Sequence, residues 1–238
     1  MHAAKKNPLF SILVIVLALG AVLCFWFLHA RSGGWDSKAA GPAIQRLAGL
    51  PLTQTRRSGT AIVSRLQSPF RIDGFPCAAG WVHFYDSGQL RAFFSDGPVT
   101  IQGNRIPSGT WVRLNADSTL AWCAFPEDTD IQGYSCRGGR GGAEGVTTGF
   151  YSSGRLSAFF PRENVMVQGI LCEASVFSPV YLHENGNLKQ CALARDEVVG
   201  NQPLSQGQTF TLSPGGQVQS VSKPYWFNWI RNWTRKLF

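Results

Sequence analysis

Apolar and polar positions along the chain recur in one frame. The stretch Phe84–Phe94 (FYDSGQLRAFF) returns as Phe150–Phe160 (FYSSGRLSAFF). Alignment on the glycine of this stretch gives five positions, each with an apolar residue two places later and Phe or Leu four places earlier: Gly88, Ser118, Gly154, Gly186 and Gly216. Their spacing of about 30 to 36 residues is typical of repeat proteins. The chain is therefore predicted to contain five equivalent units.

Each unit is predicted to contain a β-hairpin. Segments beside the aligned positions, such as Trp81–Phe84 and Trp111–Leu114, are aromatic and β-branched, which favours strands. Pairs such as Ser87-Gly88 and Asn185-Gly186 predict tight primed turns, because these turns need positive φ. A second landmark, an aliphatic residue two places before a glycine, predicts a short third strand: Ile72/Gly74, Ile101/Gly103, Ile131/Gly133, Val167/Gly169 and Val198/Gly200.

The predicted fold class is all-β, with five stacked antiparallel hairpin repeats over residues 70–222. A lone hairpin is marginally stable in water, and stacking lets each unit cover the apolar face of its neighbour. The motif Phe-Tyr-Asp-Ser-Gly-Gln-Leu with its Gly-x-Trp-Val lead-in resembles MORN-type hairpin repeats of the bacterial YwqK-like variety. The resemblance covers about residues 70–222. It implies a scaffold or contact surface and supplies no catalytic residues.

Residues 1–30 predict a short tail and a transmembrane anchor. The run Leu9–Leu28 has no charged residue and is about the 20 residues that span a bilayer core. A cleaved signal sequence is the alternative, but its apolar region would be shorter, about 7–15 residues. Lys5 and Lys6 before the run are nearly balanced by basic residues after it. The short N-terminal tail and the later cysteines favour export of the large C-terminal part.

Two segments flank the repeats. Residues 31–69 predict a linker with a short helix over Pro42–Gly49, because proline precedes it and glycine ends it. Residues 223–238 predict an amphipathic helix. Its apolar and basic sides are Trp226, Trp229, Ile230, Trp233 and Leu237 on one face, and Arg231 and Arg235 on the other. This face either lies in a membrane interface or caps the last hairpin.

The net charge of +8 is unevenly divided. Residues 1–69 carry +7, residues 70–222 carry −3 and residues 223–238 carry +4. A nucleic-acid binder concentrates positive charge on its folded domain, so this division predicts no nucleic-acid partner. Basic flanks suit anionic lipid headgroups. The expected partners are membrane lipid, through the span and in one interpretation the tail, and an unidentified protein or envelope polymer.

Cysteines occupy two positions of the repeat frame. Short spacing in an oxidising compartment favours two disulfides, Cys123–Cys136 and Cys172–Cys191, with Cys77 unpaired. Other pairings stay open. The alternative also stays open that the five cysteines after the apolar run Leu9–Leu28 are buried small apolar residues. The spacing Cys-x-x-Cys is absent, so neither a metal nor another cofactor is expected.

Catalytic motifs are absent from the sequence. The Gly-rich stretch Cys136–Gly145 lacks the Gly-Lys-Ser/Thr of a phosphate loop, and no Gly-x-Ser-x-Gly occurs. The expected function is a single-pass, membrane-anchored envelope protein with a non-catalytic binding or scaffolding surface. One alternative is an envelope hydrolase or thiol-dependent enzyme that uses Cys77, His83 or His183. A second, which rests on the family resemblance, is an immunity-type protein that neutralises a toxin.

Overall fold

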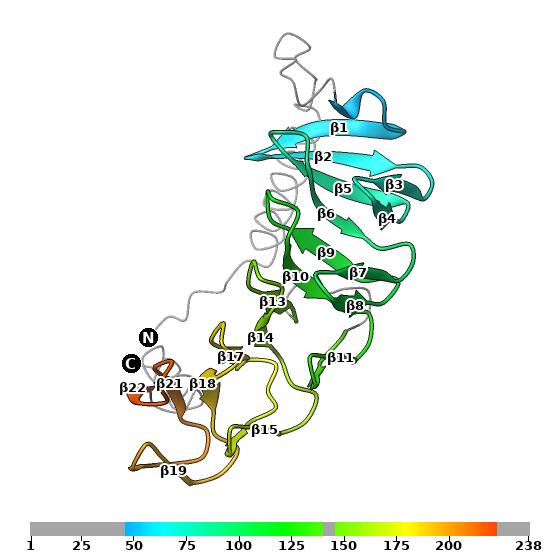
Figure 1. The fold of residues 1–238 in the computed structure, drawn as a ribbon. Helices are drawn as coiled ribbons and strands as arrows, with labels where there is room; N and C mark the ends of the chain where they lie inside the picture. The colour runs from blue at the N-terminus through cyan, green and yellow to red at the C-terminus, as the bar shows by residue number, and fades with distance from the viewer. Residues whose placement is uncertain (1–45, 140–145, 223–238) are drawn as a thin grey trace, which may run out of the picture. The chain divides into compact units, whose positions relative to one another are not determined.

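The computed structural model describes residues 46–139 and 146–222, and Figure 1 shows them as a succession of antiparallel hairpins. Twelve strands form one sheet in which neighbours in the chain are neighbours in space. They are β1 (Leu52–Ser58), β2 (Ala61–Leu66), β5 (Gly80–Tyr85), β6 (Leu90–Phe94), β9 (Trp111–Leu114), β10 (Leu120–Ala124), β13 (Thr148–Phe150), β14 (Leu156–Phe159), β17 (Val180–Leu182), β18 (Leu188–Ala192), β21 (Thr209–Leu212) and β22 (Val218–Ser222).

Five small hairpins connect the long ones and form a row along the large sheet (Figure 1). Their strands have three residues each: β3 (Phe70–Ile72) with β4 (Phe75–Cys77), β7 (Val99–Ile101) with β8 (Asn104–Ile106), β11 (Thr129–Ile131) with β12 (Tyr134–Cys136), β15 (Val165–Val167) with β16 (Ile170–Cys172), and β19 (Glu197–Val199) with β20 (Gln202–Leu204). The all-β class and the hairpin repeat are confirmed. The predicted terminal helices lie outside the described residues.

The five aligned residues occupy equivalent turns of the long hairpins, as predicted. All five have positive φ, from 65° at Ser118 to 88° at Gly186. The turn type differs from the prediction. In the first, Gly88 donates to the Tyr85 carbonyl at 2.8 Å and Tyr85 donates to the Gln89 carbonyl at 2.9 Å. One left-handed residue per turn indicates a type I turn with a glycine bulge rather than a primed turn.

The primed turns lie in the small hairpins. Asp73 and Gly74 both have positive φ, at 50° and 86°, and the pairs at 102–103, 132–133 and 168–169 repeat this geometry, which is that of a type I′ turn. The predicted third strand is thus the first strand of a second hairpin. In the fifth unit the frame is one residue off: Val199 is buried at 3% exposure, whereas Val198 is 67% exposed.

The linker prediction for residues 31–69 differs from the structure over its last part. Residues 52–66 form β1 and β2, a sixth long hairpin that pairs with β5. The polar sequence of β1 fits its place at a sheet edge, since an edge strand has one strand neighbour and is often charged. Within the described part of the predicted short helix, Arg46 and Leu47 are helical and Leu47 joins the core.

The core lies between the large sheet and the small hairpins. Alternate residues of the long strands, including Phe84, Phe93 and Phe159, pack with residues of the small hairpins such as Ile72 and Ile106 in one cluster. Successive side chains of a strand point to opposite faces, so the long strands also have a second, outer face. The term outer face is used below for this side of the large sheet.

A side-chain clamp joins the two layers in four units. The residue at the first turn position of each small hairpin accepts a hydrogen bond from the backbone N–H of the leucine that follows the long turn. The distances are 3.1 Å for Asp73–Leu90, 2.8 Å for Gln102–Leu120, 3.1 Å for Gln132–Leu156 and 2.9 Å for Gln168–Leu188. The clamp satisfies a donor that the bulged turn leaves without a ladder partner.

Removing this clamp is expected to cost about 1 kcal/mol of unfolding free energy, the usual net value of a hydrogen bond. Gln132→Gly deletes the acceptor for Leu156 while tolerating the positive φ at this position. It also removes the bonds that the Gln132 amide donates to Asn104 and Gly154, so its total loss includes about 1 kcal/mol for each of these bonds. Gln132→Asn is expected to retain most of the stability, because the equally short Asp73 reaches Leu90. Urea denaturation of both variants measures the difference. Equal losses for the two would show that the clamp contributes nothing.

Candidate binding surface

The predicted cysteine sites lie in the core. All five described cysteines are buried free thiols, so neither predicted disulfide is formed in this structure. Both predicted pairs are nevertheless brought together. The Cys172 and Cys191 thiols share a hydrogen bond, and Cys123 and Cys136 interact electrostatically. Cys123 is also the register partner of Thr148, whose side chain bonds Cys136.

Repeat equivalence explains why cysteine is accepted at these positions. The last residue of each small hairpin is Cys77, Ile106, Cys136, Cys172 or Leu204, and all are buried. The inward residue near the end of the second long strand is Phe93, Cys123, Phe159 or Cys191, and these four are buried too. Cysteine therefore takes the place of Ile, Leu or Phe, as a small apolar core residue would.

The thiols are expected to resist labelling in the folded protein. Burial raises the pKa of Cys77 and of Cys136 to about 12 and also raises the pKa of Cys123. The reactive species is the thiolate, so a thiol reagent at pH 8 should label these residues at least a hundredfold more slowly than in urea. Timed labelling with mass spectrometry measures this, and the number of thiols found in urea without reductant reports any disulfide.

The residues of the enzyme alternative do not converge. Cys77 lies in the core, whereas His83 points to the outer face, since its neighbours Val82 and Phe84 point inward. The His183 Nε2 atom lies 2.9 Å from the Leu212 carbonyl oxygen, a link between neighbouring hairpins. Among the described residues, no group of three or more His, Cys, Asp or Glu side chains is placed to hold a metal ion.

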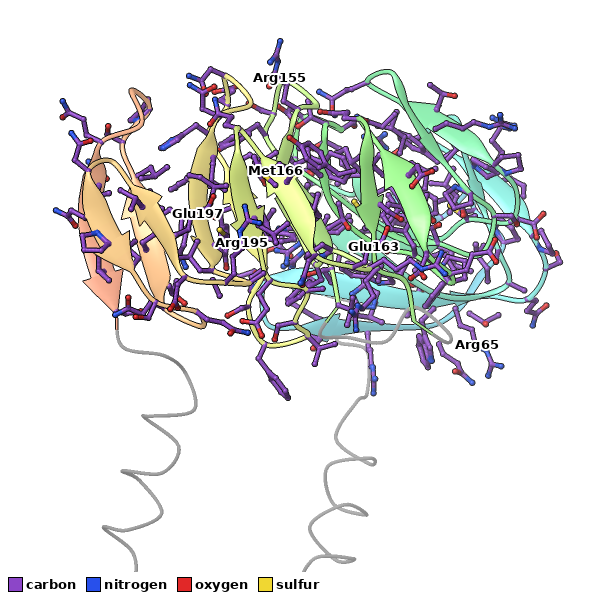
Figure 2. All side chains as sticks on the ribbon, turned by 90° about the horizontal axis from the view of Figure 1, so that it is seen from below. Arg65, Arg155, Glu163, Met166, Arg195 and Glu197 are labelled. Carbon is purple, nitrogen blue, oxygen red and sulfur yellow. The ribbon has the colours of Figure 1, made fainter. Side chains whose placement is uncertain are left out.

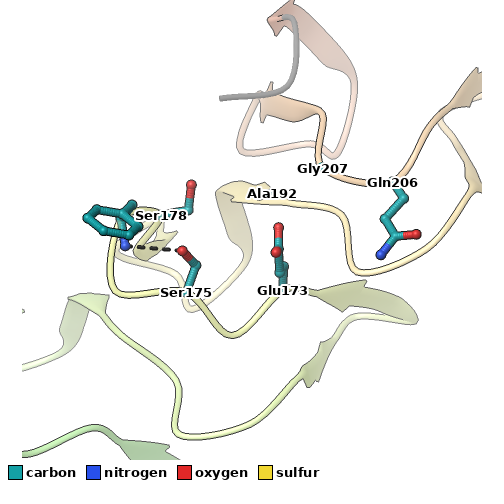
Figure 3. A pocket seen from close by; sticks show the side chains of 7 residues that line it. Glu173, Ser175, Ser178, Ala192, Gln206 and Gly207 are labelled. Carbon is teal, nitrogen blue, oxygen red and sulfur yellow. Dashed lines mark hydrogen bonds between the residues drawn. The ribbon is translucent and has the colours of Figure 1, made fainter. Parts of the chain in front are cut away.

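A hollow of about 420 Å³ lies between the loop after β16 and the β20–β21 connection (Figure 3). Its polar side chains include Glu173, Ser175, Ser178 and Gln206. The Ser175 hydroxyl accepts the Phe177 N–H at 3.1 Å, which is a local turn contact. The lining holds neither histidine nor cysteine, so it offers no nucleophile with an adjacent base of the usual kind.

The outer face is organised by one continuous register row across all twelve strands. Each residue of the row is the pairing partner of the next: Arg56, Val63, His83, Ala92, Arg113, Trp122, Gly149, Ala158, Tyr181, Gln190, Thr211 and Ser220. A sheet with this register presents side chains in straight lines at strand spacing, about 4.8 Å apart. The two halves of the row differ in chemistry, because only the half on β1–β10 carries arginine.

The outer face of β1–β10 combines arginine and tryptophan. We call this set the Arg/Trp face: Arg56, Arg65, Arg91, Arg113, Trp81, Trp111 and Trp122. Trp81 and Trp122 are 42% and 38% exposed. The Arg56 guanidinium carbon lies 5.4 Å from the centre of the Trp81 ring, a cation–π distance. No Asp or Glu lies among the outward residues of these six strands.

Two further observations concern the Arg/Trp face: a glycine that Trp122 covers, and the location of the acidic side chains. Trp122 covers Gly149 on the next strand, where an added Cβ would come within 2.7 Å of the indole ring. Acidic side chains instead occupy turns and the small-hairpin layer, where several are paired. Arg162 and Asp128 approach to 3.3 Å. Arg195 and Glu197, which are labelled in Figure 2, approach to 3.5 Å.

The charge division inferred from the sequence changes once β1 and β2 join the body. Described residues 46–139 and 146–222 carry thirteen Lys/Arg and twelve Asp/Glu, a net charge of +1. Four of these thirteen basic residues lie on the Arg/Trp face, where no acidic residue of the six strands points outward. The sequence signal for this face is the alternation of Trp81 and His83, and of Trp111 and Arg113, with apolar residues. The sequence interpretation used this alternation only to predict strands.

The membrane predictions fall outside the described residues. These include the span Leu9–Leu28 and the tail residues Trp226, Trp229, Ile230, Trp233, Leu237, Arg231 and Arg235. Within residues 46–139 and 146–222, no helix is long and apolar enough to cross a bilayer.

No family model matches the chain, and no curated protein matches it either. The resemblance to MORN-type repeats therefore stays a prediction.

Proposed function

We propose that this chain is a membrane-anchored envelope protein whose β-repeat body presents a non-catalytic binding surface, the Arg/Trp face. The carrying observation is the contrast along one register row. Along this row β1–β10 carry Arg56, Arg113 and Trp122, whereas β13–β22 carry Gly149, Ala158, Tyr181, Gln190, Thr211 and Ser220, none of them basic. Structural needs are similar in both halves, so the concentration supports a binding role.

Residue chemistry also supports this role. Arginine and tryptophan are enriched in binding hot spots, and here both project from strands rather than from loops. Strands of a continuous sheet hold side chains at fixed spacing, so the surface needs little ordering when a partner binds. The anchored part of the proposal rests on the charge-free run Leu9–Leu28, and export of the body rests on the tail and cysteine arguments given above.

Site-directed photocrosslinking tests the location of the surface. A photoreactive amino acid replaces Trp81 or Trp122 in the full chain, expressed in its own membrane. Matched positions on the same face, Thr211 and Ser220, serve as controls. We expect adducts at 81 and 122 that are several times more abundant than at 211 and 220. Equal yields at all four positions would contradict the proposal.

The enzyme alternative makes a different prediction. It requires Cys77, His83 or His183, which lie apart in this structure. Under the binding proposal, Cys77→Ala and His183→Gln in separate full-length chains should leave the crosslinking pattern unchanged. The immunity-type alternative predicts that the adduct at 81 or 122 is one protein of fixed mass, which mass spectrometry of the adduct decides.

A further inference from the structure

The Arg/Trp face owes one of its arginines to a bulge that recurs in five long hairpins. In each, the first residue paired after the turn is Leu or Val, and the residue that follows it has no register partner, because pairing skips it. The five residues are Arg91, Ala121, Ser157, Lys189 and Gln219. A bulge re-aims the side chain that it carries. In the first of these hairpins it brings Arg91 to the outer face beside Ala92.

A hollow of about 250 Å³ lies over Ala92. Ala92 is flanked in the register row by His83 on β5 and Arg113 on β9. Arg91 and Trp111 complete the rim, and Val63 contributes to the lining. The short side chain of Ala92 leaves the space that a longer residue would fill. Two guanidinium groups, one imidazole and one indole therefore surround a small depression on the outer face.

The charges around this hollow are not neutralised by carboxylates. No Asp or Glu lines it, and neither Arg91 nor Arg113 forms an ion pair with any acidic side chain of the described residues. The Arg91 guanidinium carbon lies 5.3 Å from the centre of the Tyr85 ring. That ring is fixed by a 2.7 Å hydrogen bond from its hydroxyl to the Leu114 carbonyl.

The hairpin of β17 and β18 provides an internal comparison with the hairpin of β5 and β6. Its bulge residue is Lys189, but its row contains Tyr181, Gln190 and Thr211 where the first hairpin has His83, Ala92 and Arg113. One cation is left there, and glutamine replaces the alanine that forms the floor of the hollow. The same backbone therefore carries the paired cations and the open floor at Ala92 but not at Gln190.

We propose that the hollow over Ala92, the Arg91/Arg113 subsite, binds the phosphate of an anionic phospholipid headgroup. This inference rests on the proposed function and names its ligand class. Guanidinium groups bind phosphate oxygens in a fork geometry, and two of them supply more donors than one carboxylate accepts. Trp81, Trp111 and Trp122 on the same outer face suit the membrane interface, where tryptophan is enriched.

His83 links this binding to pH. Burial, and then the positive charge of Arg91, lower the pKa of His83 below its usual 6.5. The other charged or titratable groups near it on the described strands are Arg56 on β1, Tyr85 on β5 and Arg113 on β9. A bound phosphate adds negative charge and favours the imidazolium. Headgroup affinity should therefore rise as pH falls from 7.5 to 5.5, and His83→Gln should remove that dependence.

The test is a lipid titration of the full chain in nonionic detergent. The probes are the short-chain lipids dihexanoyl phosphatidylglycerol, which is anionic, and, as the zwitterionic control with no net charge, dihexanoyl phosphatidylcholine. Calorimetry should detect binding of the phosphatidylglycerol and not of the phosphatidylcholine. Arg91→Gln and Arg113→Gln should each weaken it about tenfold or more, because each removes a charge-assisted hydrogen bond. Ala92→Gln should weaken the binding of phosphatidylglycerol although it changes no charge. Lys189→Gln removes a charge at the bulge position equivalent to Arg91 and should leave the affinity unchanged.

Each contrary result has a definite meaning. Equal binding of the two lipids, or loss of binding in Lys189→Gln alone, overturns the subsite. Tighter binding of inorganic phosphate or of a single-stranded oligonucleotide than of phosphatidylglycerol overturns the lipid as occupant. Adducts at position 81 without lipid binding leave the proposed surface intact and remove only this inference. Ala92→Gln is expected to fold, because the hairpin of β17 and β18 has glutamine, Gln190, at the equivalent position.

Discussion

Phe159→Ala is expected to lower the free energy of unfolding by about 3–5 kcal/mol, the range for removing a buried aromatic side chain. Phe159 is fully buried in the central part of the core. Its ring centre lies 4.9 Å from that of Tyr134 on the small hairpin β12, at an interplanar angle of 33°. The substitution therefore opens a cavity between the two layers. Urea denaturation followed by circular dichroism measures the loss.

Met166→Ala is the control for this prediction. Met166 lies on β15 and is 50% exposed (Figure 2), so its loss should stay within about 0.5 kcal/mol. Because each unit contacts mainly its neighbours, the cavity can also uncouple the units on either side. A reduced slope of free energy against urea would report that. A loss below about 1 kcal/mol for Phe159→Ala would contradict the two-layer core.

Gly154→Ala is expected to cost about 2–4 kcal/mol. Gly154 has φ of 82°, where an alanine pays about 1–2 kcal/mol of backbone strain. An added Cβ would also lie 2.7 Å from the Gln102 Cβ atom, and overpacking typically adds about 1–3 kcal/mol. The turn cannot shift away freely, because its carbonyl accepts hydrogen bonds from Asn104 and Gln132, both at 2.8 Å.

Gly216→Ala separates the two causes. Gly216 occupies the equivalent turn of the last hairpin with φ of 83°, and no atom lies within 4 Å of an added Cβ. Its cost should be backbone strain alone, about 1–2 kcal/mol. Thermal or urea denaturation of both variants gives the comparison. Equal costs would show that the contact between Gly154 and Gln102 is not a packing constraint.

The repeat could be predicted because two independent signals coincide within each unit. A left-handed turn residue restricts the sequence to glycine and a few others, and the inward residues on both sides must be apolar. Gly88, Gly154 and Gly186 satisfy both conditions, and Ser118 shows that the apolar frame alone can identify a unit. The second strand of each small hairpin was missed because three residues are too short to show a period.

Two errors have a common physical origin in weak local signals. The hairpin of β1 and β2 was placed in a linker, since β1 is a polar edge strand whose charged residues suit solvent. The fifth small hairpin was displaced by one residue, because Val198 and Val199 are both aliphatic and only the turn Gly200-Asn201, with φ of 55° and 65°, fixes which one is buried.

The Arg/Trp face could not be predicted from the sequence order alone. Arg56, Arg91 and Arg113 are separated by tens of residues, and their alignment follows from strand register and from the bulge at Arg91. Total charge concealed them, since the acidic residues of the turns and small hairpins cancel them in the sum. The proximity of the cysteines within each predicted pair was easier to predict than the Arg/Trp face, because the same frame that sets the turns also sets the cysteine positions.

Strand order in the large sheet follows chain order from β1 to β22. Each new strand thus finds its hydrogen-bonding partner in the segment synthesised just before it, and no loop has to wait for a distant one. Short sequence separation between contacting segments favours rapid folding. Each unit can therefore assemble on the one before it while the chain is still being synthesised, and the first units are complete before the last are made.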